Sequence, residues 1–212
     1  CIVGVGSFPG LSTAFALGAL SDDAEALDLA VRISPFSGGG PGICRLMVES
    51  LRTPSVWWED GERQTGPAVG PSAGFTFVQG PAKAVQVALP DVALLQHTSD
   101  VPTVRTWMAV QPGILAVNFR ILAALFAVAG PLEPVLAVVM EWQLRFLRSL
   151  LLRNVSSRVD LAVRVTGPSG THEVAESHAD GQAATATAVP RFITRLAEEP
   201  GPTGVRVAGT LL

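Results

Sequence analysis

Residues 113–153 read GILAVNFRILAALFAVAGPLEPVLAVVMEWQLRFLRSLLLR, and this apolar stretch decides which class of fold the chain can adopt. Its periodicity predicts two long helices that separate at Gly130-Pro131, with Pro134 in the first turn of the second helix. A membrane-spanning helix needs about 18 or more consecutive apolar residues without charge. No such run remains, because charged residues interrupt the stretch: Arg120, Glu133, Glu141, Arg145, Arg148 and Arg153. We therefore expect a long apolar helical hairpin packed on a sheet, and we do not expect it to span a membrane.

The residues on either side of this stretch alternate between strand and helix patterns. Short β-branched or alternating runs predict strands at residues 1–6, 26–33, 55–59, 62–65, 74–78, 84–89, 103–110, 158–166 and 172–177. Apolar stripes predict helices at residues 11–18, 43–51, 91–96 and 180–196. The Asp60-Gly61 dipeptide suits a turn with positive φ between two of the strands. The pattern predicts one domain over residues 1–212 that contains both strands and helices.

Composition limits the partners of this domain. The 212 residues carry a net charge of −3, and no cluster of Lys or Arg occurs along the chain, so nucleic acid is not an expected partner. The chain is apolar, with 48% hydrophobic and 16% charged residues and a mean hydropathy of +0.40. We expect a second subunit, a further domain, a lipid surface or an apolar pocket to cover the surplus of apolar side chains.

The number and spacing of the cysteines indicate the cellular compartment of the protein. Cys1 and Cys44 make no disulfide framework, and with three scattered histidines they match no zinc-binding pattern. We therefore expect no metal and a reducing, cytoplasmic location. A lipid anchor on Cys1 is disfavoured because Ile2, Val3 and Val5 predict a buried strand instead of a polar tether. The chain is interpreted as beginning inside a longer protein.

Two glycine-rich turns are candidates for binding a dinucleotide. In residues 4–10 the third glycine comes one residue late, and Pro9 lacks the amide that a phosphate would need, so a tight structural turn is the better interpretation. In residues 37–42 the free amides of Gly38, Gly39 and Gly40 suit an anion or a cofactor amide. A flexible connection between two elements explains this second loop equally well.

His178 and Asp180 precede the last predicted helix and could form an acid/base pair. Asp180 is better explained as the N-cap of that helix, because its carboxylate can accept from the unpaired amides of Gln182 or Ala183. No Ser-His-Asp order, metal cluster or phosphate-binding loop can be assembled from the remaining residues.

Five segments, taken in chain order, carry a resemblance to a known family. They are SFPGLS at residues 7–12, the glycine-rich residues 34–42, PD at residues 90–91, VPTVR at residues 101–105, and residues 178–187 together with Gly204-Val205. In this order they resemble the saccharopine-dehydrogenase-like oxidoreductases. The resemblance implies the second, substrate-side domain of such an enzyme, an α+β domain with a mixed β-sheet flanked by helices. This domain supplies the substrate pocket and the contacts of a homodimer. The family's dinucleotide-binding domain precedes it and is absent from these residues, so NAD(P) is implied as cofactor but is not expected to bind this chain alone.

One departure from the family changes the expected substrate. Lysine-pathway members carry an acidic residue where this chain has Phe8, so an amino-acid substrate is disfavoured. Phe8 and the apolar hairpin suit a lipid- or polyketide-like substrate better. The predicted substrate contacts are Phe8, Arg105, Phe119, Leu122, Met140 and Asp180. The predicted cofactor contacts are Gly38, Gly39 and Gly40, and no catalytic residue is assigned.

The sequence therefore favours the substrate domain of an NAD(P)-dependent oxidoreductase, acting with a dinucleotide-binding domain in cis or in trans. One alternative is a stand-alone domain that binds or cyclises a hydrophobic small molecule without a cofactor. Another is a non-catalytic module that uses the helical hairpin to attach to lipid or to a second subunit. The codons upstream of Cys1 discriminate between the first two, and flotation with liposomes tests the third.

Overall fold

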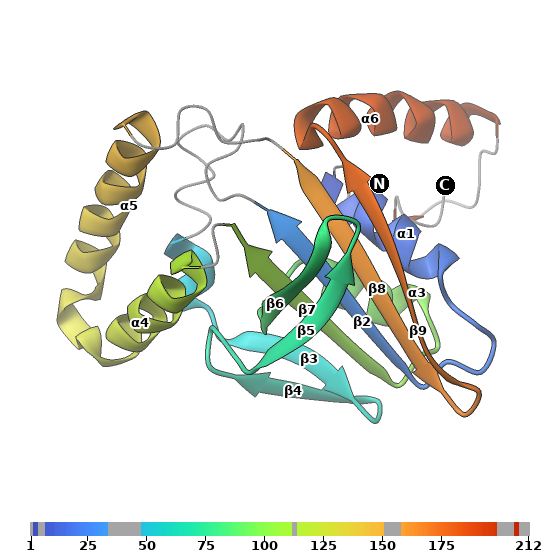
Figure 1. Ribbon diagram of the computed structural model, residues 1–212, viewed down its shortest axis with the longest axis horizontal. Helices are drawn as coiled ribbons and strands as arrows, with labels where there is room; N and C mark the ends of the chain where they lie inside the picture. The colour runs from blue at the N-terminus through green and yellow to red at the C-terminus, as the bar shows by residue number, and fades with distance from the viewer. Residues whose placement is uncertain are drawn as a thin grey trace.

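An eight-stranded mixed sheet dominates the computed structural model, which describes residues 2–3, 7–33, 48–111, 114–150, 158–198 and 206–207 (Figure 1). The strands run in the order β4-β3-β7-β2-β8-β9, and the β5–β6 pair joins the sheet through β6, which pairs with β7. Helices lie around this sheet. The predicted α+β class with a mixed sheet is confirmed.

The centre of the sheet is a parallel pair of strands. β2 (Ala26–Ile33) and β7 (Thr103–Val110) pair along their whole length, from Ala26 opposite Thr103 to Ile33 opposite Val110. Both strands have the predicted bounds. Each is buried over most of its length, as parallel strands require because both of their faces are covered. β8 (Val159–Gly167) continues the sheet antiparallel to β2, and β9 (Gly170–His178) forms its edge.

One face of the sheet, here called the helical face, is covered by two short helices. α1 (Ser12–Gly18) follows a single π-helical turn, η1 (Ser7–Leu11), and lies beside α3 (Asp91–Thr98). Leu27 and Leu29 of β2 point into this layer. They form one apolar cluster with Ala16, Val92, Leu95, Val101, Val104, Val163 and Val165.

The opposite face, here called the front face, is partly covered by a hairpin. β5 (Ser72–Phe77) and β6 (Gly80–Gln86) cross in front of β2 and β8 in Figure 1. Phe75 and Phe77 pack there on small or flat side chains of the sheet, namely Ala30, Trp107, Ala109 and Ala162. The hairpin thus places aromatic rings over the middle of the front face.

The strand predicted at residues 84–89 has the wrong bounds, since β6 spans Gly80–Gln86. Gly80, with φ of 101°, allows the chain to turn directly after Phe77 and resume pairing four residues earlier than predicted. After Gln86 the chain leaves the β5–β6 ladder. The amide of Val87 donates to the Thr106 carbonyl (3.1 Å) and that of Leu89 to the Thr106 hydroxyl (3.1 Å).

Two turns show why particular glycines are needed. Asp60 and Gly61, with φ of 52° and 79°, join β3 (Ser55–Glu59) to β4 (Glu62–Gly66), and this confirms the turn predicted for the dipeptide. Gly167, at the end of β8, lies against the connection before β2. A Cβ atom there would lie 2.3 Å from the Asp23 carbonyl oxygen, so no larger residue fits without a backbone shift.

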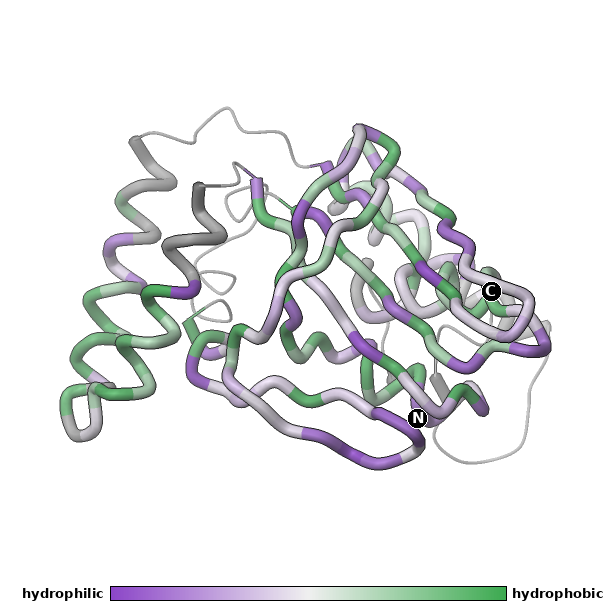
Figure 2. The backbone as a smooth tube through the Cα atoms, turned by 60° about the horizontal axis from the view of Figure 1, so that its bottom comes forward, coloured by the Kyte–Doolittle hydropathy of each residue, from purple (hydrophilic) through white to green (hydrophobic). Residues whose placement is uncertain are grey.

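The residues 114–150 form a projection that we call the helical arm. It consists of α4 (Ile114–Ala129), the 3-10 turn η2 (Gly130–Leu132) and α5 (Glu133–Leu150), and the chain turns at Gly130, as predicted (Figure 1). Its inner side packs on the end of β7 through Leu122, Phe126, Leu136 and Met140, which join Val110 in one apolar cluster. Figure 2 shows how hydrophobic the arm is compared with the β3–β4 hairpin. In the part of the chain that the structure describes, no helix is long and apolar enough to cross a membrane.

Three further elements, β1, β10 and α6, lie outside the large sheet. β1 (Ile2–Val3) and β10 (Arg206–Val207) pair with each other in parallel and form a separate two-stranded sheet. α6 (Gly181–Glu198) follows β9. The carboxylate of Asp180 accepts a hydrogen bond from the Ala183 amide (3.3 Å), which confirms the predicted N-cap.

Candidate functional site

The front face of the sheet carries two rows of polar side chains, separated by a layer of alanine and aromatic residues. β-pairing produces both rows, because side chains directly opposite each other on neighbouring strands share a face. Asp28 on β2 lies opposite Arg105 on β7 and Arg164 on β8. Four residues further along β2, Arg32 lies opposite Asp160 on β8, which in turn lies opposite Ser177 on β9.

The first row, here called the ion-paired row, consists of Glu59, Arg105, Asp28, Arg164 and Glu173, in order across β3, β7, β2, β8 and β9. Acidic and basic residues alternate along it. Arg105 Nη2 lies 2.8 Å from Glu59 Oε1, and its Nη1 lies 4.0 Å from Asp28 Oδ1. Arg164 Nη2 lies 2.5 Å from Glu173 Oε1 and also donates to the Gly74 carbonyl of the covering hairpin.

Burial raises the pKa of one carboxyl group of this row, and hydrogen bonding lowers the pKa of another. Burial raises the pKa of Asp28, although a hydrogen bond from Trp107 Nε1 (2.9 Å) and the charges of Arg105 and Arg164 oppose that shift. Hydrogen bonds from Trp57 (3.2 Å) and Arg105 lower the pKa of the exposed carboxyl of Glu59. Each guanidinium in the row has an acidic partner, so the row holds neighbouring strands together and leaves neither arginine without a counter-charge.

The second row, here called the edge row, consists of Gln111, Arg32, Asp160, Ser177 and Arg158. It lies where the parallel strands β2 and β7 both end. Asp160 is 2% exposed, and its carboxylate accepts from the Ser177 hydroxyl (2.5 Å). Arg158 also donates to Ser177 (3.4 Å) and, with the Gln79 amide oxygen turned toward it, donates from Nε to Gln79 (2.9 Å). Neutral acceptors are therefore prominent in this row.

A third polar cluster lies on the helical face, between α1 and α3. The hydroxyls of Ser12 and Thr13 donate to the same Asp91 oxygen, Oδ1, at 2.5 and 2.8 Å. Asp91 is 0% exposed, and among the described residues its second oxygen has no hydrogen-bond partner. Burial raises the pKa of this carboxyl, and the two hydroxyls oppose the shift. The cluster ties the first turns of two helices together, which is a structural role.

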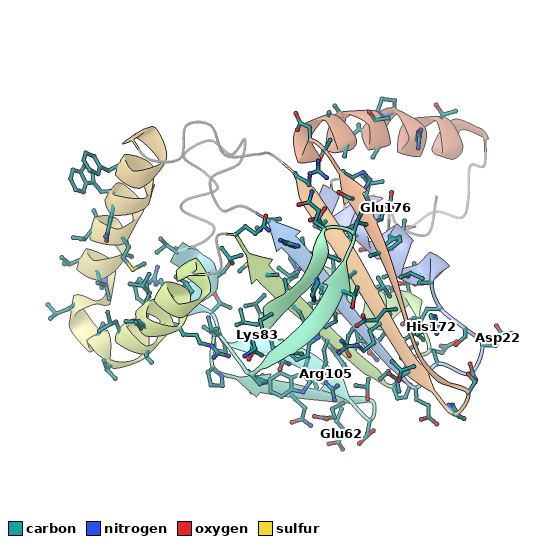
Figure 3. All side chains as sticks on the ribbon, in the orientation of Figure 1. Asp22, Glu62, Lys83, Arg105, His172 and Glu176 are labelled. Atoms are coloured by element: carbon teal, nitrogen blue, oxygen red, sulfur yellow. The ribbon has the colours of Figure 1, made fainter. Side chains whose placement is uncertain are left out.

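Among the predicted substrate contacts whose side chains the structure describes, only two lie together. Leu122 and Met140 belong to the same cluster on the inner side of the helical arm, with Leu122 partly and Met140 fully buried. Arg105 lies elsewhere, in the ion-paired row on β7 (Figure 3), and Asp180 caps α6. Phe8 lies in η1 and Phe119 in α4, but their side chains are outside the described part. Gly38, Gly39 and Gly40 also lie outside the described residues.

The sequence analysis missed the residues that form the two rows, except Arg105. A signal was present in β2, where the charged residues Asp28 and Arg32 interrupt an otherwise apolar strand. The two residues are four positions apart, so their side chains lie on the same face of the sheet. Charged residues in a central, buried strand indicate partners on neighbouring strands. The partners themselves lie up to 145 residues away, as Glu173 does from Asp28, and only the strand register identifies them.

Within the described ranges no group of three or more His, Cys, Asp or Glu side chains could hold a metal ion. Comparison with known proteins adds no family: no family model matches the chain, and no characterised protein matches it. A functional proposal therefore rests on the arrangement of the elements described above.

Proposed function

We propose that this chain is the substrate-side domain of an NAD(P)-dependent oxidoreductase that acts on an apolar, lipid- or polyketide-like substrate in the cytoplasm. The hydride would come from NAD(P)H held by a dinucleotide-binding domain, in cis or in trans. The α+β fold with a mixed sheet is the fold that the saccharopine-dehydrogenase-like resemblance implies.

The observation that carries this proposal is the β1–β10 pair. These strands run parallel and, among the described residues, form a sheet of their own that does not pair with the eight-stranded sheet. Parallel sheets occur almost entirely in multi-stranded form, with helices covering both faces, and two isolated strands are only marginally stable. A parallel sheet contributed by a dinucleotide-binding domain would supply the missing neighbours and would join this domain at β1 and β10.

The helical arm supports the apolar character of the substrate. As part of the proposal it acts as the predicted long apolar helical hairpin, with Leu122, Phe126 and Met140 forming one wall of the substrate site. Its outer side exposes Val128 (80%), Leu132 (67%) and Trp142 (66%). A second copy of the chain covers this outer side in a homodimer.

Hydride transfer tests the proposal directly. The chain is assayed together with a dinucleotide-binding domain, joined ahead of Cys1 or added in trans, and NADPH oxidation is followed with long-chain oxo- and enoyl-acyl compounds and, for comparison, with short oxo acids. We expect turnover of the long-chain compounds only. Turnover confined to short oxo acids would contradict the apolar assignment.

Two arm variants separate the inner wall from the outer side. Leu122→Asp places a charge in the partly buried cluster and should lower the free energy of unfolding by about 3 kcal/mol. Val128→Asp, at a position that is 80% exposed, should leave the monomer stable and weaken the dimer. Equal melting of Leu122→Asp and the parent protein would mean that the arm does not face the sheet.

A titration with NADPH distinguishes the stand-alone alternative. The chain by itself should give no saturable heat up to high micromolar NADPH, because the ribose and pyrophosphate contacts of a βαβ unit are missing from it. A dissociation constant in the low micromolar range would show that a dinucleotide site is complete within these residues. Saturable binding of apolar compounds without any hydride transfer in the joined protein would instead favour a cofactor-free domain that binds or cyclises them.

A further inference from the structure

The strand β9 is an edge of the eight-stranded sheet, and among the described residues it pairs only with β8 (Figure 1). Its middle is open to solvent, where Val174, Ala175 and Glu176 are all exposed. Proteins usually protect such an edge with lysine, proline or a β-bulge. β9 contains no lysine or proline, and its pairing with β8 runs without interruption. The edge is therefore able to accept a further strand.

The hydrogen bonding of β8 shows which backbone groups of β9 point away from the sheet. The Glu25 amide, ahead of β2, donates to the Thr166 carbonyl (2.8 Å), so the backbone groups of Thr166 point toward β2. Because these groups alternate in direction along a strand, those of Val163 point toward β9, where Val163 pairs with Val174. The alternate residues of β9, here called the outward residues, therefore direct their amides and carbonyls to the open edge. They are Thr171, Glu173, Ala175 and Ser177.

The sequence of β9 favours one antiparallel pairing of this strand with β9 of a second copy of the chain. Outward residues have to pair with outward residues, because their backbone groups form the bonds. When the pairing is centred on Val174, His172 of each copy lies opposite Glu176 of the other. Centring it on Glu173 or Glu176 would oppose two carboxylates, and centring it on Ala175 would oppose His172 and His178. Like charges directly opposite each other are destabilising, so the centre at Val174 is preferred.

A pairing centred on Val174 would also extend an existing core. Val174 is 37% exposed, whereas its neighbour Val163 on β8 is 0% exposed and belongs to the apolar cluster of the helical face. Two valines opposite each other in a pair without main-chain bonds lie close, with about 4.5 Å between their Cα atoms. They would cover each other. His172 and Glu176 lie along β9 on the two sides of this centre, on the same face as Val174 (Figure 3).

From these observations we propose that β9 is a self-association edge, at which two copies of the chain pair their β9 strands antiparallel about Val174. The contact joins two eight-stranded sheets into one and forms about eight main-chain hydrogen bonds through the outward residues. It goes beyond the proposed function and is separate from the contact of the helical arm. Two such two-fold contacts, at the arm and at β9, would link the chains into an assembly larger than a dimer.

Disulfide trapping tests the contact and its register. The reference protein carries Cys1→Ser and Cys44→Ser, so that only an introduced thiol reacts. Val174→Cys places two thiols opposite each other at a Cα separation of about 4.5 Å, which a disulfide can span. Mild oxidation should convert most of this variant into a disulfide-linked dimer. The matched control Thr171→Cys, on the same strand, leaves its two thiols about 20 Å apart and should stay unlinked.

A proline variant tests whether the main chain forms the contact. Ala175→Pro, added to Val174→Cys, removes an outward amide and leaves the bonds with β8 in place, since an edge strand tolerates proline where its N–H faces solvent. Cross-linking should fall about tenfold. Thr65→Pro, at an exposed position of the opposite edge strand β4, is the matched control and should leave cross-linking unchanged. If Ala175→Pro does not fold, His172→Glu should reduce cross-linking severalfold, because it opposes two carboxylates, and the further change Glu176→His should restore it.

Three results would overturn the proposal. Equal cross-linking of Val174→Cys and Thr171→Cys would mean that the chains meet by random collision, and cross-linking that survives Ala175→Pro would mean that another surface brings them together. No cross-link of Val174→Cys at all would leave the edge to a strand of a different protein. Val128→Asp, which tests the contact of the helical arm, should leave the cross-linking of Val174→Cys unchanged, so failure of the arm contact and failure of the β9 contact are distinguishable.

Discussion

The ion-paired row and the edge row lie on the same face of one sheet, four residues apart along β2, and yet they are built for different tasks. In the ion-paired row every guanidinium meets a carboxylate, with distances of 2.8 Å for Arg105 and 2.5 Å for Arg164. In the edge row the buried carboxylate of Asp160 is satisfied by a hydroxyl, and Arg32 is held by neutral acceptors. The first row is therefore held by ion pairs, whereas the second is held mainly by hydrogen bonds with neutral partners.

The largest expected difference between the rows concerns their aspartates. Asp28→Ala should lower the free energy of unfolding by about 3 kcal/mol, because it leaves the Trp107 indole N–H without its acceptor and Arg105 and Arg164 without a shared counter-charge. Asp160→Ala should cost only about 1 kcal/mol, since it removes one hydrogen bond with a hydroxyl that can turn to another partner. Urea unfolding of both variants measures the difference. A larger loss for Asp160→Ala would reverse the assignment of the two rows.

Substitution of Arg164 and of Arg32 should show a similar but smaller difference in the free energy of unfolding. Arg164→Met leaves the Glu173 carboxylate, 23% exposed at its side chain, without its partner, and should cost about 2 kcal/mol. Arg32→Met should cost at most about 1 kcal/mol, because methionine also packs on the Phe77 ring and only neutral acceptors lose a donor. Thermal unfolding of Arg164→Met and Arg32→Met compares the two losses of stability. Equal losses would indicate a hidden counter-charge at Arg32.

Within the ion-paired row, Asp28 and Glu59 have pKa values shifted in opposite directions. The stability that each contributes should therefore depend on pH with opposite sign. The folded-state pKa of Asp28 is raised, so its stabilising contribution is present at low pH and is lost as pH rises through that pKa. The pKa of Glu59 is lowered, so its contribution is present at neutral pH and is lost as pH falls through the folded value. The stability advantage of the parent over Asp28→Asn should therefore fall with rising pH, and that over Glu59→Gln should rise. Urea titrations between about pH 3 and pH 7 measure both slopes, and slopes of equal sign would contradict the assignment.

A position outside both rows sets the baseline for these measurements. Asp180→Asn should change the free energy of unfolding by less than about 0.5 kcal/mol, because asparagine caps a helix as well as aspartate does. The joined enzyme should keep its activity in this variant. Unchanged melting together with a large loss of activity would give the Asp180 carboxylate a chemical role in place of a structural one.

Local features of the fold were predictable from the sequence. The alternation of apolar residues predicted β2 and β7 to the residue, and the Asp60-Gly61 turn, the break at Gly130 and the Asp180 cap were also correct. Each of these depends on interactions within a few residues. The wrong bounds of β6 have a tertiary cause, since the amides of Val87 and Leu89 bond to Thr106 of another strand.

The candidate site was much less predictable. Arg105 was singled out, but its partners Glu59 and Asp28 lie 46 and 77 residues away in the chain and were not. Leu122 and Met140 were grouped correctly because both lie on the apolar side of one helical stretch. Arg32 is conspicuous as a charge in an apolar strand, but no local pattern in the sequence identifies Asp160 as the residue opposite it.

The amino-acid sequence by itself therefore determined the presence of both strands and helices, the bounds of the central strands β2 and β7, and several turns, because strand alternation, helix periodicity and turn chemistry act over short distances. It did not predict β10. Tertiary structure alone decided which charges meet. A shift of one residue in the β2–β8 register would move Arg164 to the face opposite Asp28. Whether a guanidinium such as that of Arg32 is neutralised or left open depends on that register, which the packing of the whole sheet sets.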